Sequence, residues 1–336
     1  MTDRGRAFPT EGPWLSVVMP TFNGAAHLEE ALASVAAARD PGVELIAVDD
    51  GSTDATLRIL DRYASLLPLE VVTRGRVGNW VANTNHGLSR ARAPWACILH
   101  QDDRWRPGRL PRLRRLIERD PGVDFAFHAS RYVDEAGEVL GRWTCPLTDD
   151  APLQPTHLVQ RLLVQNFIAV PAPVFRRELF ERVGGMDDRL WYTADWDLWL
   201  KLAAAGPSRY CAAELADFRL HALSQTLQGS KDQAAFREQL ETVLERHLAI
   251  HGLSGGAVAR AARFSVELNV AAAGAYHGRR AALGRLAFLA LTLGPGAARA
   301  FLRDSRIHQR ALSRLRLQRR ILTGRHGTET RRSIDG

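Results

Sequence analysis

The sequence is poor in lysine and cysteine, and both shortages limit what the protein can be. Lys201 and Lys231 are the two lysines among 336 residues, so the formal net charge of +8 rests on arginine. The three cysteines, Cys97, Cys145 and Cys211, are widely separated and odd in number, which argues against a disulfide framework and a cysteine metal site. We therefore expect a reducing interior such as the cytoplasm.

Long apolar runs are also missing. The longest candidate, residues 286–293, falls far short of the roughly 20 residues that a membrane-spanning helix needs. Residues 1–13 lack the apolar stretch of a signal peptide, so we expect a flexible N-terminus without a secretion signal. The content of 46% hydrophobic and 24% charged residues predicts a globular chain rather than a disordered one.

What the sequence does have is an alternation of short apolar runs and helical patterns from residue 15 onwards. The expected strands are residues 15–20, 43–49, 69–73 and 95–100, with a helix between each pair. This β-α order requires right-handed crossovers between parallel strands. It predicts an α/β fold with a doubly wound, mostly parallel sheet and helices on both faces.

The pattern changes after about residue 120. Residues 124–143 are typical of an antiparallel hairpin that turns at residues 135–137, and a helix is expected near residues 156–166. From Lys231 onwards the sequence contains helical patterns and no convincing strand. We expect a flexible segment at 1–13, a main domain at 14–230 and a helical extension with a basic tail at 231–336.

Three polar loops follow the expected strands. They are PTFNG at residues 20–24, DDGSTD at 49–54 and HQDD at 100–103. In doubly wound sheets the ligand crevice lies beyond the carboxyl ends of the strands, so the three loops should converge there.

The HQDD loop places Asp102 and Asp103 side by side after a buried strand. Like charges repel and resist desolvation, so the pair needs an explanation. One interpretation is a solvated turn that caps the following helix. The other is a divalent cation held between these carboxylates and a substrate diphosphate, because hard cations prefer oxygen ligands.

The DDGSTD loop also allows two interpretations. Gly51 permits a sharp turn, and Ser52 or Thr53 can cap the next helix, which makes a good strand-to-helix connection. Such a connection does not require the two carboxylates of Asp49 and Asp50. A carboxylate at this edge could accept hydrogen bonds from a nucleobase imide or a ribose hydroxyl.

Five segments, in order and spacing, resemble the family-two glycosyltransferases with the GT-A fold, over about residues 15–221. They are SVVMPTFNGAAHLEEALASV, ELIAVDDGSTDAT, ILHQDDRWRPGRL, RRELFERVGGMDDRL and TADWDLWLKLA. The resemblance implies an inverting glycosyltransferase that moves a sugar from a nucleoside-diphosphate sugar to the hydroxyl of a glycan or a lipid-linked acceptor, with Mn²⁺ or Mg²⁺ as cofactor.

The resemblance also implies roles for individual residues. The residues that match nucleotide-sugar positions are Pro20, Thr21, Phe22, Asn23, Asp49, Asp50, Asn85, Gln101 and Asp102. The family's Asp-x-Asp metal motif places its last acid at Asp102, whereas His100 stands where the first Asp usually is. The expected metal ligands are therefore Asp102, Asp103 as a substitute and His221, with Arg219 as an alternative phosphate partner.

Asp195 matches the acid on the acceptor side of the family, and the resemblance assigns it as general base. The alternative from the residues alone is that Asp195 caps the helix that begins there. The apolar positions of that helix are expected in the core because they recur at helical spacing; they are Trp196, Leu198, Trp199 and Leu202.

The basic tail leaves two interpretations. Residues 301–336 hold ten arginines and three acids, hence +7 of the formal +8, and the arginines recur near helical spacing. Such a helix can lie on an anionic membrane surface, which would make the protein peripheral on the inner face of the membrane. It can equally be a solvated helix or one paired with another subunit, and an oligomer stays open.

Two rival functions remain. A sugar-nucleotide nucleotidyltransferase would need a basic, glycine-rich loop after the first strand, whereas PTFNG has one glycine and no base. A non-catalytic module that binds sugar nucleotides or polysaccharide is plausible because His100 departs from the metal motif. No recognition motif supports nucleic-acid binding.

Overall fold

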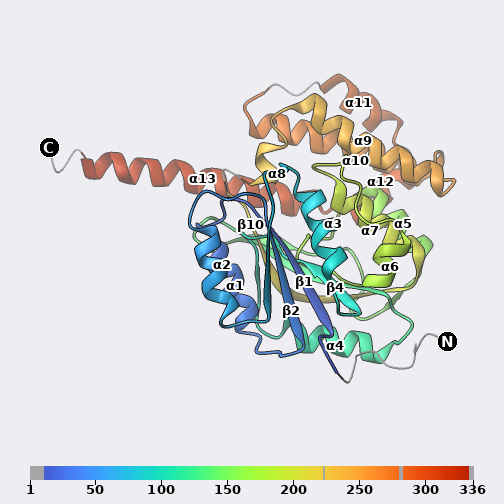
Figure 1. Ribbon diagram of the computed structural model, residues 1–336. Coiled ribbons are helices and arrows are strands. Elements are labelled where there is room, and N and C mark those ends of the chain that lie inside the picture. Colours follow the sequence, from blue (N-terminus) through green and yellow to red (C-terminus); the bar gives the residue numbers. More distant parts are fainter. Residues whose placement is uncertain (1–10, 222–223, 280–282, 333–336) are drawn as a thin grey trace.

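The computed structural model describes residues 11–221, 224–279 and 283–332. Its centre is a ten-stranded mixed sheet in the order β3-β2-β1-β4-β9-β6-β10-β5, with β7 and β8 paired at the side (Figure 1). The four strands expected from the apolar runs are parallel where they pair: β1 (Leu15–Thr21), β2 (Val43–Asp49), β3 (Leu69–Thr73) and β4 (Trp95–Ile98).

The strands β1, β2 and β4 are buried on both faces because helices cover each side, whereas β3 at the edge of the sheet is half-buried. Val17 and Val18 of β1 are adjacent in sequence and join two different apolar clusters, as the alternation of side chains along a strand requires. The connecting helices are α1 (Leu28–Ala36), α2 (Thr56–Ala64) and α3 (Trp80–Arg90). The doubly wound architecture is confirmed.

The second half of the sheet mixes strand directions. The remaining strands are β5 (Arg104–Trp105), β6 (Phe125–Val133), β7 (Val139–Trp143), β8 (Pro152–Leu153), β9 (Val174–Arg176) and β10 (Ser208–Arg219). β9 lies antiparallel between β4 and β6, and β10 runs parallel to β6. The hairpin of β6 and β7 is present, and its turn places Gly137 at a φ of 82°.

Four further helices cover this half: α4 (Arg109–Arg119), α5 (Pro155–Val164), α6 (Arg177–Arg182) and α7 (Ala194–Ala205). Trp199 of α7 is fully buried, and its ring stacks on Phe125 of β6 with 5.9 Å between the ring centroids. The other apolar positions expected in the core of this helix, Trp196, Leu198 and Leu202, are buried as well.

The C-terminal part consists of helices, namely α8 (Gln225–Gln228), α9 (Gln233–Ile250), α10 (Gly256–Tyr276), α11 (Leu283–Thr292), α12 (Gly294–Asp304) and α13 (Ile307–Arg332). Val243, Leu244 and Leu248 of α9 belong to the same apolar cluster as Phe125 of the sheet. Among the described residues no helix is both long and apolar enough to cross a membrane.

The helix α13 packs against β7. Its C-terminal end extends away from the body of the molecule (Figure 1). Arg316 donates to the carbonyl oxygen of Leu140 at 2.7 Å, and Arg320 pairs with Asp134 at the start of the hairpin turn. The first half of this helix is therefore docked on the sheet domain rather than solvated on all sides.

A buried ion pair ties α12 to α5, and it generates a prediction. Arg161 Nε lies 2.8 Å from Asp304 Oδ1, and the Asp304 side chain is fully buried. Asp304→Ala leaves the Arg161 charge without this partner, so the free energy of unfolding should fall by about 3–5 kcal/mol. Urea denaturation measures this change.

The control is Glu181→Ala, which removes the partner of Arg177 from an exposed i,i+4 pair. This pair should contribute less than about 1 kcal/mol. Equal effects of the two substitutions would show that Asp304 does not hold the helical extension in place.

Candidate active site

A single cavity of about 480 Å³ opens where β1, β2 and β4 end. It extends past the end of β10 to the first turn of α7, so it connects Asp102 with Asp195. The residues that the sequence singled out and that line this cavity are Pro20, Thr21, Phe22, Asp50, His100, Gln101, Asp102, Asp195, Arg219 and His221.

One end of the cavity is formed by Phe22, Asp50 and Arg76. The Arg76 guanidinium lies over the Phe22 ring, 3.6 Å from its centroid, and pairs with the Asp50 carboxylate. Asp50 also accepts hydrogen bonds from the backbone nitrogens of Val77 at 2.7 Å and Gly78 at 2.9 Å. Burial would raise the pKa of Asp50, but these donors outweigh it and lower the pKa below the usual value.

Gln101 connects the loop after β4 with the loop after β1. Its side chain accepts from the Phe22 nitrogen at 2.9 Å and donates to the Phe22 oxygen at 3.0 Å. A side chain at Gly24 would collide with the Gln101 amide, so glycine is needed for this close approach. The two hydrogen bonds hold the two loops together where Phe22 and Gln101 line the cavity.

Asp49 and Asn23 lie behind the cavity wall rather than in it. Asp49 accepts from the nitrogens of Gly51 at 3.1 Å and Ser52 at 2.9 Å, and the Asn23 side chain accepts from Thr53 N at 2.8 Å. Both residues brace the turn after β2.

The expected helix cap by Ser52 or Thr53 is wrong. The helix α2 begins at Thr56, and the Asp54 carboxylate accepts from the Thr56 nitrogen at 2.9 Å. Ser52 instead accepts from the nitrogen of Asn23. Its hydroxyl thus connects the first loop with the second.

The HQDD loop does not cap the next helix either. The helix α4 begins at Arg109 after Gly108, five residues beyond Asp103. Ligand atoms of His100, Asp102 and Asp103 all lie within 4.8 Å of one another. His100 Nε2 and Asp103 Oδ2 are buried and have no hydrogen-bond partner in the part of the chain that the structure describes, which leaves both atoms able to bind a ligand. The donor set of two carboxylates and an imidazole fits a divalent cation.

The two neighbouring acids have opposite pKa shifts. Burial alone would raise the pKa of Asp102, but the hydrogen bond from His221 Nε2, at 2.9 Å, and the nearby His100 lower it. Burial and then the Asp102 charge raise the pKa of Asp103 well above the usual value. Without a cation, Asp102 is therefore the more acidic member of the pair. His221 uses its Nε2 to contact Asp102, and it does not belong to the cluster of His100, Asp102 and Asp103.

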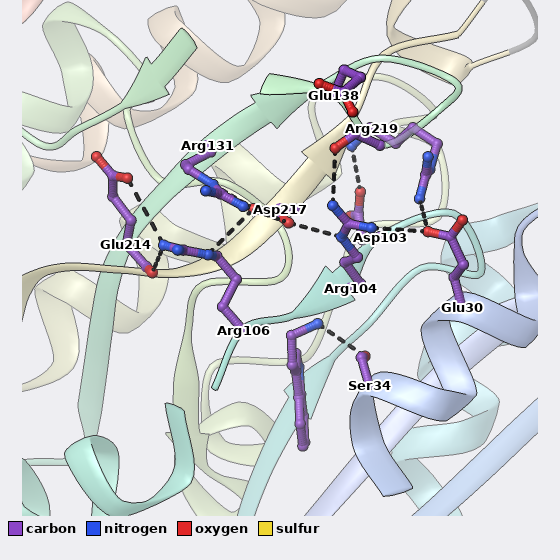
Figure 2. A network of polar contacts seen from close by, with 12 residues as sticks. Glu30, Ser34, Asp103, Arg104, Arg106, Arg131, Glu138, Glu214, Asp217 and Arg219 are labelled. Atoms are coloured by element: carbon purple, nitrogen blue, oxygen red, sulfur yellow. Dashed lines mark hydrogen bonds and ion pairs between the residues drawn. The ribbon is translucent and has the colours of Figure 1, made fainter. Parts of the chain in front are cut away.

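Arg219, at the end of β10, holds this loop in place (Figure 2). Its Nε donates to the Asp102 carbonyl oxygen at 2.8 Å, and its backbone nitrogen donates to Asp103 Oδ1 at 2.9 Å. Its guanidinium also pairs with Glu30 of α1 at 2.6 Å. The side chain is fully buried. Arg219 is thus a positioning residue whose charge already has a partner.

A second group of ion pairs supports Arg219 from the same strand. Asp217 of β10 accepts from Arg104 and Arg131, each at 2.8 Å, and Arg104 also reaches Glu30 (Figure 2). Because Arg104 directly follows the HQDD loop, this network anchors the C-terminal end of that loop.

Asp195 lies in the first turn of α7, two positions after the helix boundary residue Thr193. Its Oδ2 accepts from Asn166 Nδ2 at 3.0 Å. Burial raises the pKa of Asp195 from 3.8 to about 6, against the lowering effects of Asn166, the Trp196 nitrogen and Arg310. A carboxyl with this pKa is suited to general-base catalysis near neutral pH.

Asn85 lies outside the cavity lining. Its side chain donates to the Met186 carbonyl oxygen at 2.8 Å and accepts from the Met186 nitrogen at 3.1 Å. These bonds fasten α3 to the turn after α6. Asn85 therefore supports the fold around the site in this structure.

The sequence did not assign every cavity residue to the site, and the polar ones that it missed include Arg76, Asn166, Arg310 and Arg314. Arg76 follows β3, whose carboxyl end reaches the same sheet edge, so topology offered a signal for it. Arg310 and Arg314 come from α13, in the basic tail. Arg310 and Arg314 line the cavity, and Arg320 pairs with Asp134.

Comparisons with known proteins agree with this geometry. Residues 16–184 match the family described as glycosyl transferase family 2. An uncharacterized glycosyltransferase of Haemophilus influenzae is 25% identical over 190 residues, which cover 56% of this chain and 61% of that protein. An uncharacterized protein of Mycobacterium tuberculosis is 31% identical over 215 residues, which cover 62% of this chain and 59% of that protein. The chain thus spans less than two thirds of these relatives.

Two solved structures share the architecture. Staphylococcus aureus TarS 1–349 in complex with UDP-GlcNAc has a TM-score of 0.56 at 17% identity and covers 85% of this chain and 90% of its own. The mannosyltransferase PcManGT of Pyrobaculum calidifontis, in complex with GDP-Man and Mn²⁺, has a TM-score of 0.51 at 21% identity, with coverages of 92% and 88%. The likeness confirms the expected GT-A fold.

The cluster around Asp102 makes a prediction about metal binding. Asp102→Ala removes the more acidic carboxylate of the cluster, so the affinity for Mn²⁺ should fall by tenfold or more. Electron paramagnetic resonance of free Mn²⁺ measures this change. Glu70→Gln is the control because Glu70 pairs with Arg90 at the exposed edge of the sheet, outside the cavity. Unchanged Mn²⁺ affinity in Asp102→Ala would place the metal elsewhere.

Proposed function

The chain belongs to glycosyltransferase family 2, and on this premise we propose that it transfers a sugar from a nucleoside-diphosphate sugar to an acceptor hydroxyl with inversion at the anomeric carbon. The observation that carries the proposal is that one cavity joins Asp102 with Asp195. A single displacement needs one group to favour departure of the diphosphate and another to take the proton of the incoming hydroxyl. The acceptor is a glycan or a lipid-linked precursor.

The end formed by Phe22, Asp50 and Arg76 is suited to the nucleoside. Phe22 and Arg76 offer an aromatic and a planar guanidinium surface for a base, and Asp50 offers acceptor oxygens at the carboxyl end of β2. TarS with UDP-GlcNAc and PcManGT with GDP-Man support a donor of this class for this chain.

The cluster of His100, Asp102 and Asp103 would hold the divalent cation, Mn²⁺ or Mg²⁺. When bound, the cation would neutralise charge on the departing nucleoside diphosphate, an effect worth several kcal/mol. This chain's own contribution is to fix the ligands: Arg219 holds the Asp102 carbonyl and the Asp103 carboxylate, while Gln101 holds the loop against Phe22.

Asp195 would accept the proton of the acceptor hydroxyl. Its carboxylate is oriented by Asn166 and carries no ion pair in the described structure, so it is free to act as a base. With a pKa of about 6, Asp195 is still mostly ionised at neutral pH and is more basic than an ordinary aspartate. The proton moves from the hydroxyl oxygen to Asp195 as the new glycosidic bond forms.

The geometry counts against both rivals. A nucleotidyltransferase would need free backbone amides after β1 to hold a triphosphate. Here, side chains of the protein already accept hydrogen bonds from the nitrogens of Phe22, Asn23, Gly24 and Ala25. A non-catalytic binding module has no use for a buried acid of raised pKa beside its ligand cavity, and Asp195 is such an acid.

The proposal is tested by incubating the protein with Mn²⁺ and a panel of UDP, GDP and dTDP sugars and measuring the nucleoside diphosphate that is released. With the donor found in this way, Asp195→Asn should lower turnover by about 10²–10⁴ because the general base is lost. Donor binding, measured by thermal stabilisation, should persist.

The matched control is Asp188→Asn, which alters an exposed acid shortly before α7. This variant should keep the turnover of the unmodified chain. An active Asp195→Asn variant would remove Asp195 from its role, and the absence of binding for every sugar nucleotide would defeat the proposed donor class.

The raised pKa of Asp195 makes a prediction about pH. The base works when ionised, so turnover should fall tenfold per pH unit below about pH 6 rather than below the ordinary aspartate pKa of 3.8. Asn166→Ala removes the hydrogen bond that lowers this pKa and should move the acidic limb to higher pH. A pH–rate profile measures both. A limb that stays near pH 4, or that Asn166→Ala leaves in place, would contradict the assignment.

A further inference from the structure

The cavity contains four arginines, and they differ in their partners. Arg76 pairs with Asp50, and Arg219 pairs with Glu30. Among the residues that the structure describes, no carboxylate lies within ion-pair distance of Arg310 or Arg314. Two guanidinium charges that share one cavity and have no ion-paired carboxylate repel each other and attract an anion.

The surroundings of these two arginines do not neutralise them. Arg310 donates to the Asn166 carbonyl oxygen, and its guanidinium lies 5.3 Å from the centroid of the Trp143 ring. The neighbouring phenols are neutral: burial raises the pKa of Tyr132 to about 12 and also raises that of Tyr192, although Arg310 and Arg314 oppose the shift. The helix α13 therefore brings two positive charges to this part of the cavity wall. The acid of the same wall, Asp195, interacts with Arg310 but is not ion-paired with it.

The position of the arginines relates them to the acceptor. The Asn166 carbonyl oxygen accepts from Arg310, while the Asn166 side chain donates to Asp195. One residue thus connects the unpaired charge with the general base. At the metal-binding cluster, by contrast, the nearest arginine is Arg219, whose guanidinium is held by Asp102, Glu30 and the hairpin turn.

We propose that the acceptor carries a phosphate ester close to its reactive hydroxyl and that Arg310 and Arg314 bind this phosphate. Guanidinium groups match the planar, bidentate geometry of phosphate oxygens. With the phosphate held there, the adjoining hydroxyl would face Asp195. The inference rests on the proposed function for the role of the cavity, and it names the chemical class of acceptor.

The test is calorimetric titration of the full chain with glycerol 1-phosphate and, in parallel, with glycerol, which has hydroxyls and no phosphate. The chain is first saturated with Mn²⁺ and with UDP or GDP, whichever it binds, so that the donor site is filled. Glycerol 1-phosphate should bind and glycerol should not. Arg310→Gln and Arg314→Gln should each weaken binding about tenfold, the scale of one lost charge-assisted hydrogen bond.

Matched variants keep the test decisive. Arg310 also contacts Asn166 and Trp143, so Arg314→Gln and the charge-retaining Arg314→Lys carry the argument if Arg310→Gln does not fold. Arg314→Lys should bind the phosphate more tightly than Arg314→Gln. Arg299→Gln is the control, because Arg299 is an exposed arginine of α12 outside the cavity, and it should bind like the unmodified chain.

Two results would overturn the inference. Phosphate binding that is unchanged in both glutamine variants would place the anion elsewhere. Binding that disappears when a nucleoside diphosphate is present would assign the arginines to the donor instead.

The failure of the proposed function is a separate outcome. If no nucleoside diphosphate binds at all, the proposed function fails. The titration of the unliganded chain with glycerol 1-phosphate still decides whether Arg310 and Arg314 hold a phosphate.

Discussion

The structure depends on keeping two adjacent carboxylates, Asp102 and Asp103, at the buried end of β4. Two like charges there would be costly. The pKa values of the two acids therefore shift in opposite directions: His221 helps to lower that of Asp102, while burial and the Asp102 charge raise that of Asp103, which accepts from the Arg219 backbone. Arg219 in turn needs Glu30 to balance its buried charge. This linked set keeps the ligands in a metal-ready arrangement, and a divalent cation would remove the repulsion that remains.

Much of the fold could be predicted from local sequence, because parallel strands buried on both faces leave continuous apolar runs. The strands β1 to β4 and the hairpin of β6 and β7 carried such signals. The short strands β5, β8 and β9 did not, since two or three residues have no readable period. The sheet order, with β9 between β4 and β6, depends on long-range pairing that no local pattern encodes.

The site could be predicted where its residues follow strands, because the carboxyl ends of parallel strands meet at one edge. Asp50, Gln101 and Asp102 are examples. Arg310 and Arg314 escaped prediction for two reasons: their position depends on how α13 packs against β7, and in an arginine-rich tail no single arginine stands out. Asn85 matched a family position, yet its contacts with Met186 serve the packing of α3. A match to a family position therefore does not by itself place a side chain in the cavity.

The central claim is that a sugar nucleotide lies in the cavity between a metal-binding acid and a free base. The most direct measurement is a crystal structure of the chain with Mn²⁺ and the sugar nucleotide that it binds. The account predicts the ion on Asp102, the nucleoside beside Phe22 and Arg76, and the anomeric carbon facing Asp195. A nucleotide bound outside this cavity, or one whose anomeric carbon points away from Asp195, would contradict it.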